Sequence, residues 1–538
     1  MTTDIRETEQ KYEAEIGAVL PSLEELPQVA TVSEPEAVTL VAEYYDTDDL
    51  RLLKGGVTLR RREGGSDEGW HLKLPDDAAD GTARRTAGAS SRREIRLSLG
   101  QGDRDRLDRL DRHPDDASDP VPEELARLVQ VHARGASLVP VARIETHRRI
   151  TTLRDAAGTS LAEIAADEVA AQSMGTTTIL SRWNEIEVEL TGGSPDLLRA
   201  TAKRFRHSGL RPSGRPAKLE RALAAYPGGQ NGTVEADRRL TPRSSAGAVV
   251  SAYLNAQASR LKALDPAVRR DEPDAVHQMR ITTRRLRATF QAFPVVVPKP
   301  ATAHLREELR WLGHVLGDAR DAEVLDQHFH SELASTPTEL VIGPAQARVT
   351  AHFASRQAAA RDAVLAALDS ARYFGLLDEL DQLLDDLSQA APPTPAAGEI
   401  LPRAVAHSYR RTKHRMHRAQ HAPAGAARDV ALHEARKAAK RARYAAEAVR
   451  PTFGKEAKRF SKRMKAVQSV LGYHQDAVTA RTVAREIGIS AHLAGENAFS
   501  FGLLNERAHR DSLEYQRQAR SVWKHATRSE ARRWLSRH

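Results

Sequence analysis

The chain has 538 residues, a formal net charge of +9 and a sequence pI of about 9.6. It contains no cysteine, which excludes disulfides and thiolate metal sites, so any metal has to bind carboxylate or histidine ligands. The length predicts at least two domains, and the basic balance favours a polyanionic partner: nucleic acid, an anionic membrane or polyphosphate. No apolar run reaches transmembrane length and the N-terminus is polar and acidic, so we expect a cytoplasmic protein without a membrane partner.

Strands with one charged face are predicted repeatedly in the first part of the chain. In Glu7-Thr8-Glu9-Gln10-Lys11, a strand would place Glu7, Glu9 and Lys11 on one face, because side chains alternate along a strand. The same alternation recurs at Arg60 and Arg62, at Lys73, at Arg92 and Glu94, and at Glu185, Glu187 and Glu189. Several such strands in one domain predict a β-barrel with an ionic lumen. The alternative is that each charged face simply meets solvent.

The remaining local patterns fit an α+β domain. In chain order we predict strands over 4–16, 40–47, 57–63, 70–74, 92–97, 139–153, 160–169 and 183–190. Asp155 to Gly158 would form the turn of a hairpin between two of them. Helices are expected near 21–30 and at 101–112, 122–133 and 195–208, with a loop at 76–91.

An ionic lumen suits a compact polyanion such as a triphosphate. Arginine forks and lysines converging from several strands match phosphate oxygens. Hydrolysis also needs charge neutralisation, which Mg²⁺ or Mn²⁺ on carboxylate ligands supplies. A tunnel with acidic and basic strands would provide both.

These motifs are similar to those of the CYTH domains of triphosphate tunnel metalloenzymes. The similarity covers residues 1–226 and rests on Glu7-x-Glu9-x-Lys11, Leu59 to Arg62, Trp70 to Lys73, Arg92-x-Glu94, the basic strand at Arg148, the strand ending in Asp167, and Glu185-x-Glu187-x-Glu189. A closing Ser-Lys motif is kept only as Ala217-Lys218. The resemblance implies an eight-stranded antiparallel β-tunnel and metal-dependent attack on a triphosphate.

The resemblance also implies roles for individual residues. Glu7, Glu9 and Lys11 would be catalytic, with Lys11 orienting a water or an acidic neighbour. One or two metal ions, Mg²⁺ or Mn²⁺, would bind Glu7, Glu9, Asp167, Glu187 and Glu189. Phosphate oxygens would contact Arg60, Arg62, Lys73, Arg92, Arg148 and Lys218. The roles of Arg143 and Glu185 stay open.

After a Gly- and Pro-containing linker at 227–244, the pattern becomes helical to the end of the chain, 245–538. We predict helices at 245–265, 273–293, 300–330, 340–371, 373–389, 399–420, 428–450, 454–485 and 495–535, with a break at 390–397.

An internal repeat organises this helical part. His277, Arg280, Arg284, Arg285 and Arg287 recur as His433, Arg436, Lys440, Arg441 and Arg443, each 156 residues later. Leu316-Gly317 with Asp321 recurs as Leu471-Gly472 with Asp476, 155 residues later. Two halves of one design predict a pseudo-twofold all-α bundle. Positions 0, +3, +7 and +10 share one helical face, so each repeat carries a basic stripe that an anion would neutralise. The alternative is a solvated face with acidic neighbours.

This part resembles a CHAD domain, on the basis of His277 to Arg287, His433 to Tyr444 and the two Leu-Gly-x-x-x-Asp motifs. The resemblance implies a basic groove that binds inorganic polyphosphate. The expected contacts are His277, Arg280, Arg284, Arg285, Arg287, His433, Arg436, Lys437, Lys440, Arg441 and Arg443, with Lys458, Lys462 and Lys465 from a further helix.

The leading hypothesis is therefore a metal-dependent inorganic triphosphatase that converts tripolyphosphate to pyrophosphate and phosphate and also binds long-chain polyphosphate. One alternative is an organic substrate: thiamine triphosphate, a nucleoside triphosphate, or ATP in an adenylate cyclase reaction. Another is a non-catalytic polyphosphate-binding protein, with association with polyphosphate granules an open option. Nucleic acid is less favoured because the basic stripes lack interleaved aromatic residues. The oligomeric state is not predicted.

Overall fold

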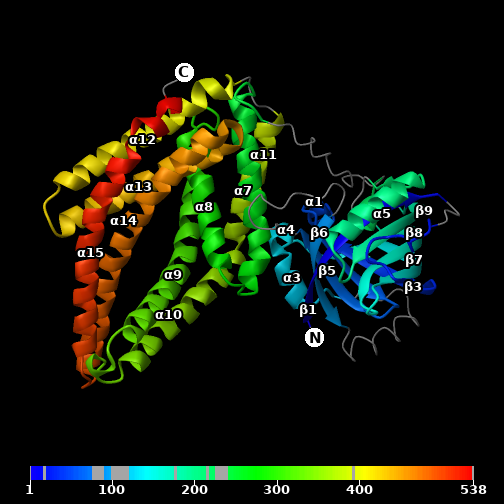
Figure 1. Cartoon of the computed structure of the whole chain (residues 1–538), viewed down its shortest axis with the longest axis horizontal. Helices are drawn as coiled ribbons and strands as arrows, with labels where there is room; N and C mark the ends of the chain where they lie inside the picture. Colours follow the sequence, from blue (N-terminus) through cyan, green and yellow to red (C-terminus); the bar gives the residue numbers. More distant parts are fainter. Residues whose placement is uncertain are drawn as a thin grey trace. The chain divides into compact units, whose positions relative to one another are not determined.

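The computed structural model describes residues 2–15, 20–75, 90–98, 120–174, 178–213, 217–224, 240–389 and 394–535. The chain forms two compact units, Met1–Ala236 and Asp237–His538, and the boundary falls inside the segment predicted as a linker (Figure 1). Among the described residues, every helix is too short or too polar to span a membrane.

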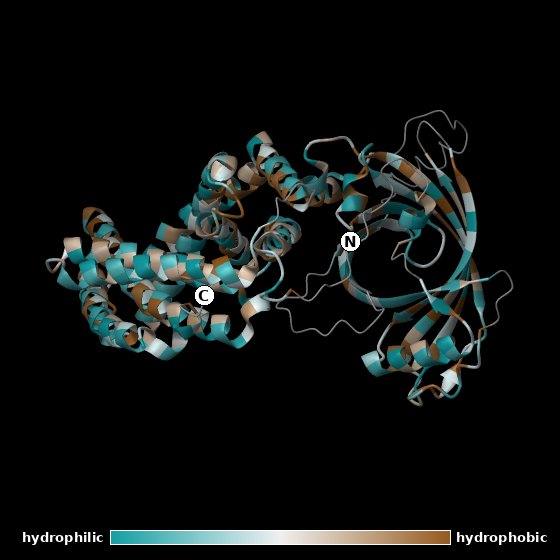
Figure 2. Ribbon diagram, turned by 90° about the horizontal axis from the view of Figure 1, so that it is seen from above, coloured by the Kyte–Doolittle hydropathy of each residue, from teal (hydrophilic) through white to brown (hydrophobic). Residues whose placement is uncertain are grey.

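The first unit is built on eight long antiparallel strands. These are β1 (Thr2–Ala14), β3 (Glu36–Asp46), β4 (Thr58–Glu63), β5 (Gly69–Pro75), β6 (Ser90–Ser98), β7 (Val139–Arg154), β8 (Ser160–Ser173) and β9 (Leu180–Leu190). The strand order is β1-β6-β5-β4-β3-β7-β8-β9, and β9 pairs back with β1. In Figure 2 these strands curve round into a ring. The predicted eight-stranded antiparallel barrel is confirmed.

The outer face of the barrel strands carries apolar side chains that pack against helices covering the wall. Tyr12 on β1 packs edge-on against Phe205 of α5 (Pro195–His207), with ring centroids 4.8 Å apart. Leu72 on β5 is buried in a cluster with Leu125 and Val129, at α3 (Glu123–Leu128) and α4 (Gln130–Ala133). Because side chains alternate along a strand, an apolar outer face leaves the charged residues facing the lumen.

Several shorter elements complete the first unit. The strands β2 (Thr31–Val32) and β10 (Arg211–Pro212) pair with β7 and β1, and α1 (Arg51–Lys54) and α6 (Lys218–Ala222) are single turns. The predicted hairpin between β7 and β8 is confirmed: the Asp155 carboxylate accepts hydrogen bonds from the backbone N–H groups of Ala157 and Thr159.

One of the predicted helices in this unit is not formed, and another lies outside the described residues. The helix expected near 21–30 is wrong, because this segment forms turns: Pro21 and Pro27 flank it, and Gln28 has a left-handed φ of 71°. The helix expected at 101–112 and most of the loop at 76–91 lie outside the described residues.

The second unit is all-helical. Its helices are α7 (Ala246–Arg269), α8 (Ala275–Ala292), α9 (Ala303–Ala334), α10 (Ala345–Leu368), α11 (Ala371–Gln389), α12 (Ala397–His421), α13 (Ala426–Ala448), α14 (Arg450–Leu493) and α15 (Phe499–Ala526), with single 3₁₀ turns at Pro300–Thr302, Thr338–Leu340, Ser529–Ala531 and Arg533–Leu535. The helix predicted from 454 begins earlier, at Arg450, and Gly454 forms a kink with φ 54° and ψ −124°.

The sequence repeat is visible in this unit as two similar halves. The helix α8 corresponds to α13 and α9 to α14, as the basic and Leu-Gly motifs require. Phe329 of α9 and Phe353 of α10 share one core with Ile487 of α14 and Phe501 of α15. The predicted pseudo-twofold bundle is confirmed, and it sets α8 and α13 in contact.

Candidate functional site

A cavity of about 490 Å³ inside the barrel is lined largely by charged side chains. Eleven of the predicted site residues line it: Glu7, Glu9, Lys11, Arg60, Arg62, Lys73, Arg92, Arg148, Glu187, Glu189 and Lys218. The predicted Asp167 is buried behind this lining, where it contacts Arg148 and Lys218. The strands thus bring together acidic and basic groups that are up to about two hundred residues apart in sequence.

Glu187 is the centre of one buried network. Its carboxylate lies 2.5 Å from Lys11 Nζ, 2.6 Å from Arg148 and 2.7 Å from Lys218 Nζ. Burial alone would raise the pKa of Glu187, but these three cations hold that pKa well below its usual range. The carboxylate is therefore ionised at neutral pH and fixes three cations around the lumen.

Lys218 occupies the position that a metal ion would take in an acidic cluster. Oxygens of Asp167, Glu185 and Glu187 lie within 4.8 Å of one another, which is a spacing suited to a cation. The Lys218 ammonium contacts all three, at 2.9, 2.6 and 2.7 Å. Glu185 is therefore a partner of Lys218, and it also accepts a hydrogen bond from Trp183 Nε1.

A second network lies on the strands β1, β5 and β6. The Glu7 carboxylate pairs with Lys73 and lies 3.2 Å from Arg96. Glu94 is fully buried and contacts Arg96 at 2.5 Å and His71 Nδ1 at 3.0 Å. Burial would raise the pKa of Glu94, but His71 and the surrounding cations hold it below its usual range.

Glu189, like Glu163 of the same cavity lining, forms no ion pair with any described residue, whereas Glu7, Glu9, Asp67 and Glu187 each do. In the strand register it lies between Glu9 on β1 and Glu163 on β8. Burial, followed by repulsion from Glu7, raises the pKa of Glu189 to about 7. Like charges directly opposed across strands are destabilising, and a hard divalent cation prefers such oxygen ligands. The donor set around Glu189 therefore fits Mg²⁺ or Mn²⁺.

Sequence reasoning missed several residues of this cavity. Arg96 and Glu163 line it on the same strand faces as Glu94 and Asp167, as strand alternation predicts, but they were given no role in the predicted site. Asp67 lies between β4 and β5, where it pairs with Arg62, and no periodic pattern marks it. Tyr44 lines the cavity from β3 and accepts a hydrogen bond from Arg60 at 3.2 Å. Arg143, by contrast, is an exposed residue outside this lining.

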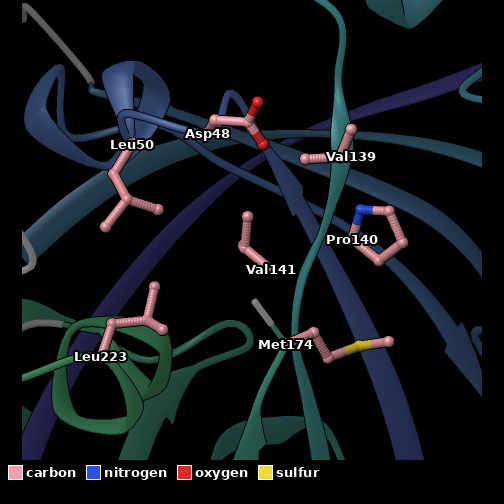
Figure 3. Close-up of a pocket in the computed structure, with 7 residues that line it drawn as sticks. All are labelled: Asp48, Leu50, Val139, Pro140, Val141, Met174 and Leu223. Carbon is pink, nitrogen blue, oxygen red and sulfur yellow. The ribbon is translucent and has the colours of Figure 1, made fainter. Parts of the chain in front are cut away.

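A different hollow of the first unit is apolar. It measures about 270 Å³, and Figure 3 shows its lining: Asp48, Leu50, Val139, Pro140, Val141, Met174 and Leu223. With one carboxylate and no cation in that lining, it does not suit a phosphate group.

In the helical unit, α8 and α13 bring the two basic stripes together. Each Leu-Gly-x-x-x-Asp motif receives an arginine from the preceding basic helix. A Cβ on Gly317 would lie 3.2 Å from Arg280, and one on Gly472 would lie 3.3 Å from Arg436. Arg280 pairs with Asp321 at 2.7 Å. The glycines therefore leave room for guanidinium groups to lie against the next helix.

This basic groove has polar groups without partners. The Nε atoms of Arg284 and Arg436 and the Nδ1 atoms of His277 and His433 are buried and lack a hydrogen-bond partner among the described residues. Burial, and after it Arg436, lowers the pKa of Lys440 to about 6. Unsatisfied buried donors are costly, and an oxyanion would satisfy them.

The other predicted groove residues divide into two groups. Arg285 and Arg443 converge on Glu447, at 3.5 and 2.6 Å, and Lys437 pairs with Glu434 at 2.9 Å. The second group has no carboxylate within 4 Å among the described residues. It consists of Arg287, Arg441 and the exposed lysines of α14, Lys458, Lys462 and Lys465. Lys458 and Lys465 share a helix face with Gly472, at intervals of seven residues.

Two of the similar chains among solved structures are a Streptomyces protein and a plant domain. PptA from Streptomyces chartreusis is 20% identical with a TM-score of 0.44, over 52% of this chain and 100% of that chain. The CHAD domain from the plant Ricinus communis is 24% identical with a TM-score of 0.40, over 56% of this chain and 94% of that chain.

Comparison of the sequence with known families and proteins covers nearly the whole chain. Residues 6–215 match the CYTH domain family and residues 252–485 match the CHAD domain family. An uncharacterized protein of Mycobacterium tuberculosis, found in strains H37Rv and CDC 1551, is 36% identical over 519 residues, which is 93% of this chain and 92% of that protein. The chain belongs to the family of proteins that join an N-terminal CYTH domain to a C-terminal CHAD domain.

Proposed function

We propose that the CYTH unit is a metal-dependent inorganic triphosphatase, which hydrolyses tripolyphosphate to pyrophosphate and phosphate, and that the CHAD unit binds inorganic polyphosphate. The triphosphatase proposal rests on the mixed lining of the barrel cavity, where seven or more cations lie among carboxylates. A lumen for an anion alone would need only the cations. The carboxylates, above all Glu189, support a divalent cation beside the anion.

The cations of the lumen would grip the phosphate oxygens. Arg60, Arg62, Lys73, Arg92, Arg148 and Lys218 enter it from different strands and from α6, so they surround a chain of phosphates instead of lining one side. Burial, and then Arg60, lowers the pKa of Arg62 to about 9. A phosphate placed between these two arginines would relieve that repulsion, because an opposite charge favours the charged form. Phosphoryl transfer depends mainly on this kind of positioning and charge stabilisation.

Glu9 and Glu189 would hold the metal, with Glu7 and Glu187 on the neighbouring positions of their strands. Asp167 belongs to the proposed ligand set, but both its oxygens contact Arg148, and one also contacts Lys218. Bound there, Mg²⁺ or Mn²⁺ would neutralise phosphate charge and make an attacking water more acidic. Lys11 lies 3.6 Å from Glu9 and 2.5 Å from Glu187, which supports a role in orienting these acidic neighbours.

A substrate panel with Mg²⁺ and Mn²⁺ tests the enzymatic part. We expect phosphate release from tripolyphosphate to exceed release from ATP and thiamine triphosphate. We expect Glu9→Gln to reduce that rate by about a hundredfold or more, since it removes a charge placed where the reaction needs it. Glu168→Gln, an exposed carboxylate next to Asp167, is the matched control and should be neutral.

Three results would overturn the enzymatic part of this proposal. ATP conversion without tripolyphosphate hydrolysis would assign the tunnel to an organic substrate. Full turnover by Glu9→Gln would exclude metal catalysis through β1, and no turnover of any triphosphate would leave a binding role for the tunnel.

The polyphosphate-binding part is supported by the α8–α13 groove. The unpartnered Nε atoms of Arg284 and Arg436 would donate to phosphate oxygens, and the Nδ1 atoms of His277 and His433 would do so when protonated. Arg436→Gln combined with Lys440→Gln should weaken the binding of long-chain polyphosphate to the full chain. Unchanged binding would contradict a groove at this position.

A further inference from the structure

The helix α12 carries a concentration of positive charge that its counterpart in the other half lacks. Between Pro402 and His421 it has six Arg or Lys residues, four His and no Asp or Glu. The corresponding first helix of the other half, α7, begins beside it, as the bridge between Ser245 and Ala396 shows. In α7 the cations Arg260 and Lys262 have partners, Gln278 at 3.1 Å and Asp381 at 2.6 Å. The two halves of the pseudo-twofold repeat therefore differ in the charge of their first helices.

Five cations in the second half of α12 are accessible. Arg410, Arg411, Lys413 and Arg418 are exposed and Arg415 is half-buried. Within the described part of the chain, no carboxylate oxygen lies within 4 Å of any of them. A row of like charges three and four residues apart on a helix is self-repulsive. Glu434 of α13 acts on Arg415 only from beyond ion-pair distance, so the row favours an external anion.

This row is continuous with the groove between α8 and α13. A hollow of about 310 Å³ is lined by Lys299, Arg306, His407, Arg411 and Arg441, together with small or neutral residues of α8, α12 and α13. A more open depression on α12 shares His407 and Arg411 with it and continues to Arg410, His414, Arg415 and Arg418.

The same path is seen in the electrostatics. Burial, and after it Arg411, lowers the pKa of the Arg441 guanidinium. Burial, and after it Arg310, Arg441 and Arg284, lowers the pKa of Arg287. The cations thus follow one another from the centre of the groove to the exposed face of α12.

We propose that the exposed face of α12, formed by His407, Arg410, Arg411, His414, Arg415 and Arg418, is a second polyphosphate-contacting surface that extends the α8–α13 groove. This inference rests on the polyphosphate binding proposed above. It adds that the CHAD unit distinguishes polyphosphates by length, because only a chain that leaves the groove reaches this surface.

The chemistry of the surface favours polyphosphate over other polyanions. Base stacking needs exposed aromatic rings, but Tyr409, the one aromatic residue of α12, is buried and stacks on Trp523 with ring centroids 6.1 Å apart. A membrane-binding helix needs an apolar face for the lipid, but the lining of the depression is entirely His and Arg. Residues 407 to 418 extend about 16 Å along the helix axis, which accommodates several phosphates.

The test compares two chain lengths on the full protein. The variant Arg411→Gln/Arg415→Gln/Arg418→Gln removes three charges from a helix surface. We expect it to weaken the binding of polyphosphate of about a hundred phosphates by roughly tenfold or more at low salt, and to reduce the slope of log affinity against log salt by about two to three. Binding of a chain of about five phosphates, which fits within the groove, should change by less than about twofold.

Controls separate this inference from the proposed function. Arg517→Gln/Arg520→Gln/Lys524→Gln on α15 removes the same charge from another exposed surface and should have little effect. Arg436→Gln/Lys440→Gln should weaken both chain lengths. If it does so while the α12 variant binds both chains normally, the extension is wrong and the groove stands. If an RNA of equal charge loses binding in the α12 variant and polyphosphate does not, the surface belongs to nucleic acid. If neither variant affects long chains, the proposed function itself fails.

Discussion

The barrel lumen and the basic groove both gather cations, but they neutralise them differently. In the lumen, Lys11, Arg148 and Lys218 each lie within 3 Å of a carboxylate. In the groove, Arg284 and Lys440 face further cations, and the Nε of Arg284 is without a hydrogen-bond partner in the described structure. The lumen pairs its cations with carboxylates of the protein itself, whereas the groove cations need an external anion.

The difference follows from what each region has to hold. Charges enclosed by a barrel are removed from water, so an unpaired one would cost several kcal/mol, and pairing keeps the empty tunnel stable. The groove leaves cations unpaired at a cost in the free protein, since burial lowers the pKa of Lys440 to about 6, and a bound polyanion would remove that cost. The tunnel also needs carboxylates if a divalent cation works beside the phosphates, while a groove that only binds polyphosphate does not. The contrast is thus consistent with a reaction in one unit and binding in the other.

The largest expected effect comes from breaking the balance in the lumen. Glu187→Gln leaves Lys11, Arg148 and Lys218 around a neutral group, and loss of one partner from a buried ion pair typically costs about 3–5 kcal/mol. We expect the unfolding transition of the CYTH unit to move to lower temperature by calorimetry on the full chain. Lys440→Met in the groove is the matched change, and it should leave stability unchanged or increase it. A comparable loss in both variants would show that the two regions do not differ in this way.

The strand pattern predicted which charges face the lumen because alternation is a local property. Glu7, Glu9 and Lys11 line the cavity together, as do Arg60 and Arg62. The sequence repeat likewise matched the Arg280 stripe with the Arg436 stripe and the Gly317 motif with the Gly472 motif, and in the structure each arginine lies against the motif of its own half. Periodicity and repetition thus located the faces and the stripes.

Pairing could not be predicted, because it depends on register between distant strands. Lys11 and Glu187 are 176 residues apart, and nothing local indicates that they meet. Lys218 was expected to contact phosphate. It lies among Asp167, Glu185 and Glu187, because α6, which follows the barrel strands in the sequence, packs against the barrel. Asp67 was missed for a related reason: a turn has no period, so its aspartate looked like an ordinary loop residue.

The pH dependence of polyphosphate binding offers an intermediate effect. Lys440 has a pKa of about 6 in the free protein, because burial and the nearby Arg436, Arg284 and Arg280 outweigh Asp476. A bound phosphate would raise that pKa, so binding takes up a proton. Affinity should therefore rise as pH falls from about 8 to about 6, by up to about tenfold per pH unit, and level off below the free pKa. Titrations at constant ionic strength would measure it.

Lys440→Arg is the control for this pH dependence, since arginine stays charged throughout the range. It should abolish the slope between pH 7 and 8. His277 and His433 have pKa values lowered by burial, so any slope that they add falls at lower pH, beneath their usual value, and should survive in this variant. An unchanged slope between pH 7 and 8 would exclude Lys440 as its source.

The smallest expected effect is a change in KM on substitution of Asp67, a loop residue whose carboxylate lies in the tunnel. It pairs with Arg62 and lies 3.6 Å from Arg96, so it occupies two cations that line the cavity. A triphosphate has to displace it, whereas Glu187 is held by three cations and stays. Asp67→Asn should keep the loop in place, because His71 Nε2 contacts the backbone oxygen of Asp67 at 2.8 Å, and it should lower KM for the triphosphate about two- to fivefold with little change in kcat. Glu68→Gln, the next residue, is the control. A raised KM in Asp67→Asn would show that this carboxylate positions Arg62 for the substrate and does not compete with it.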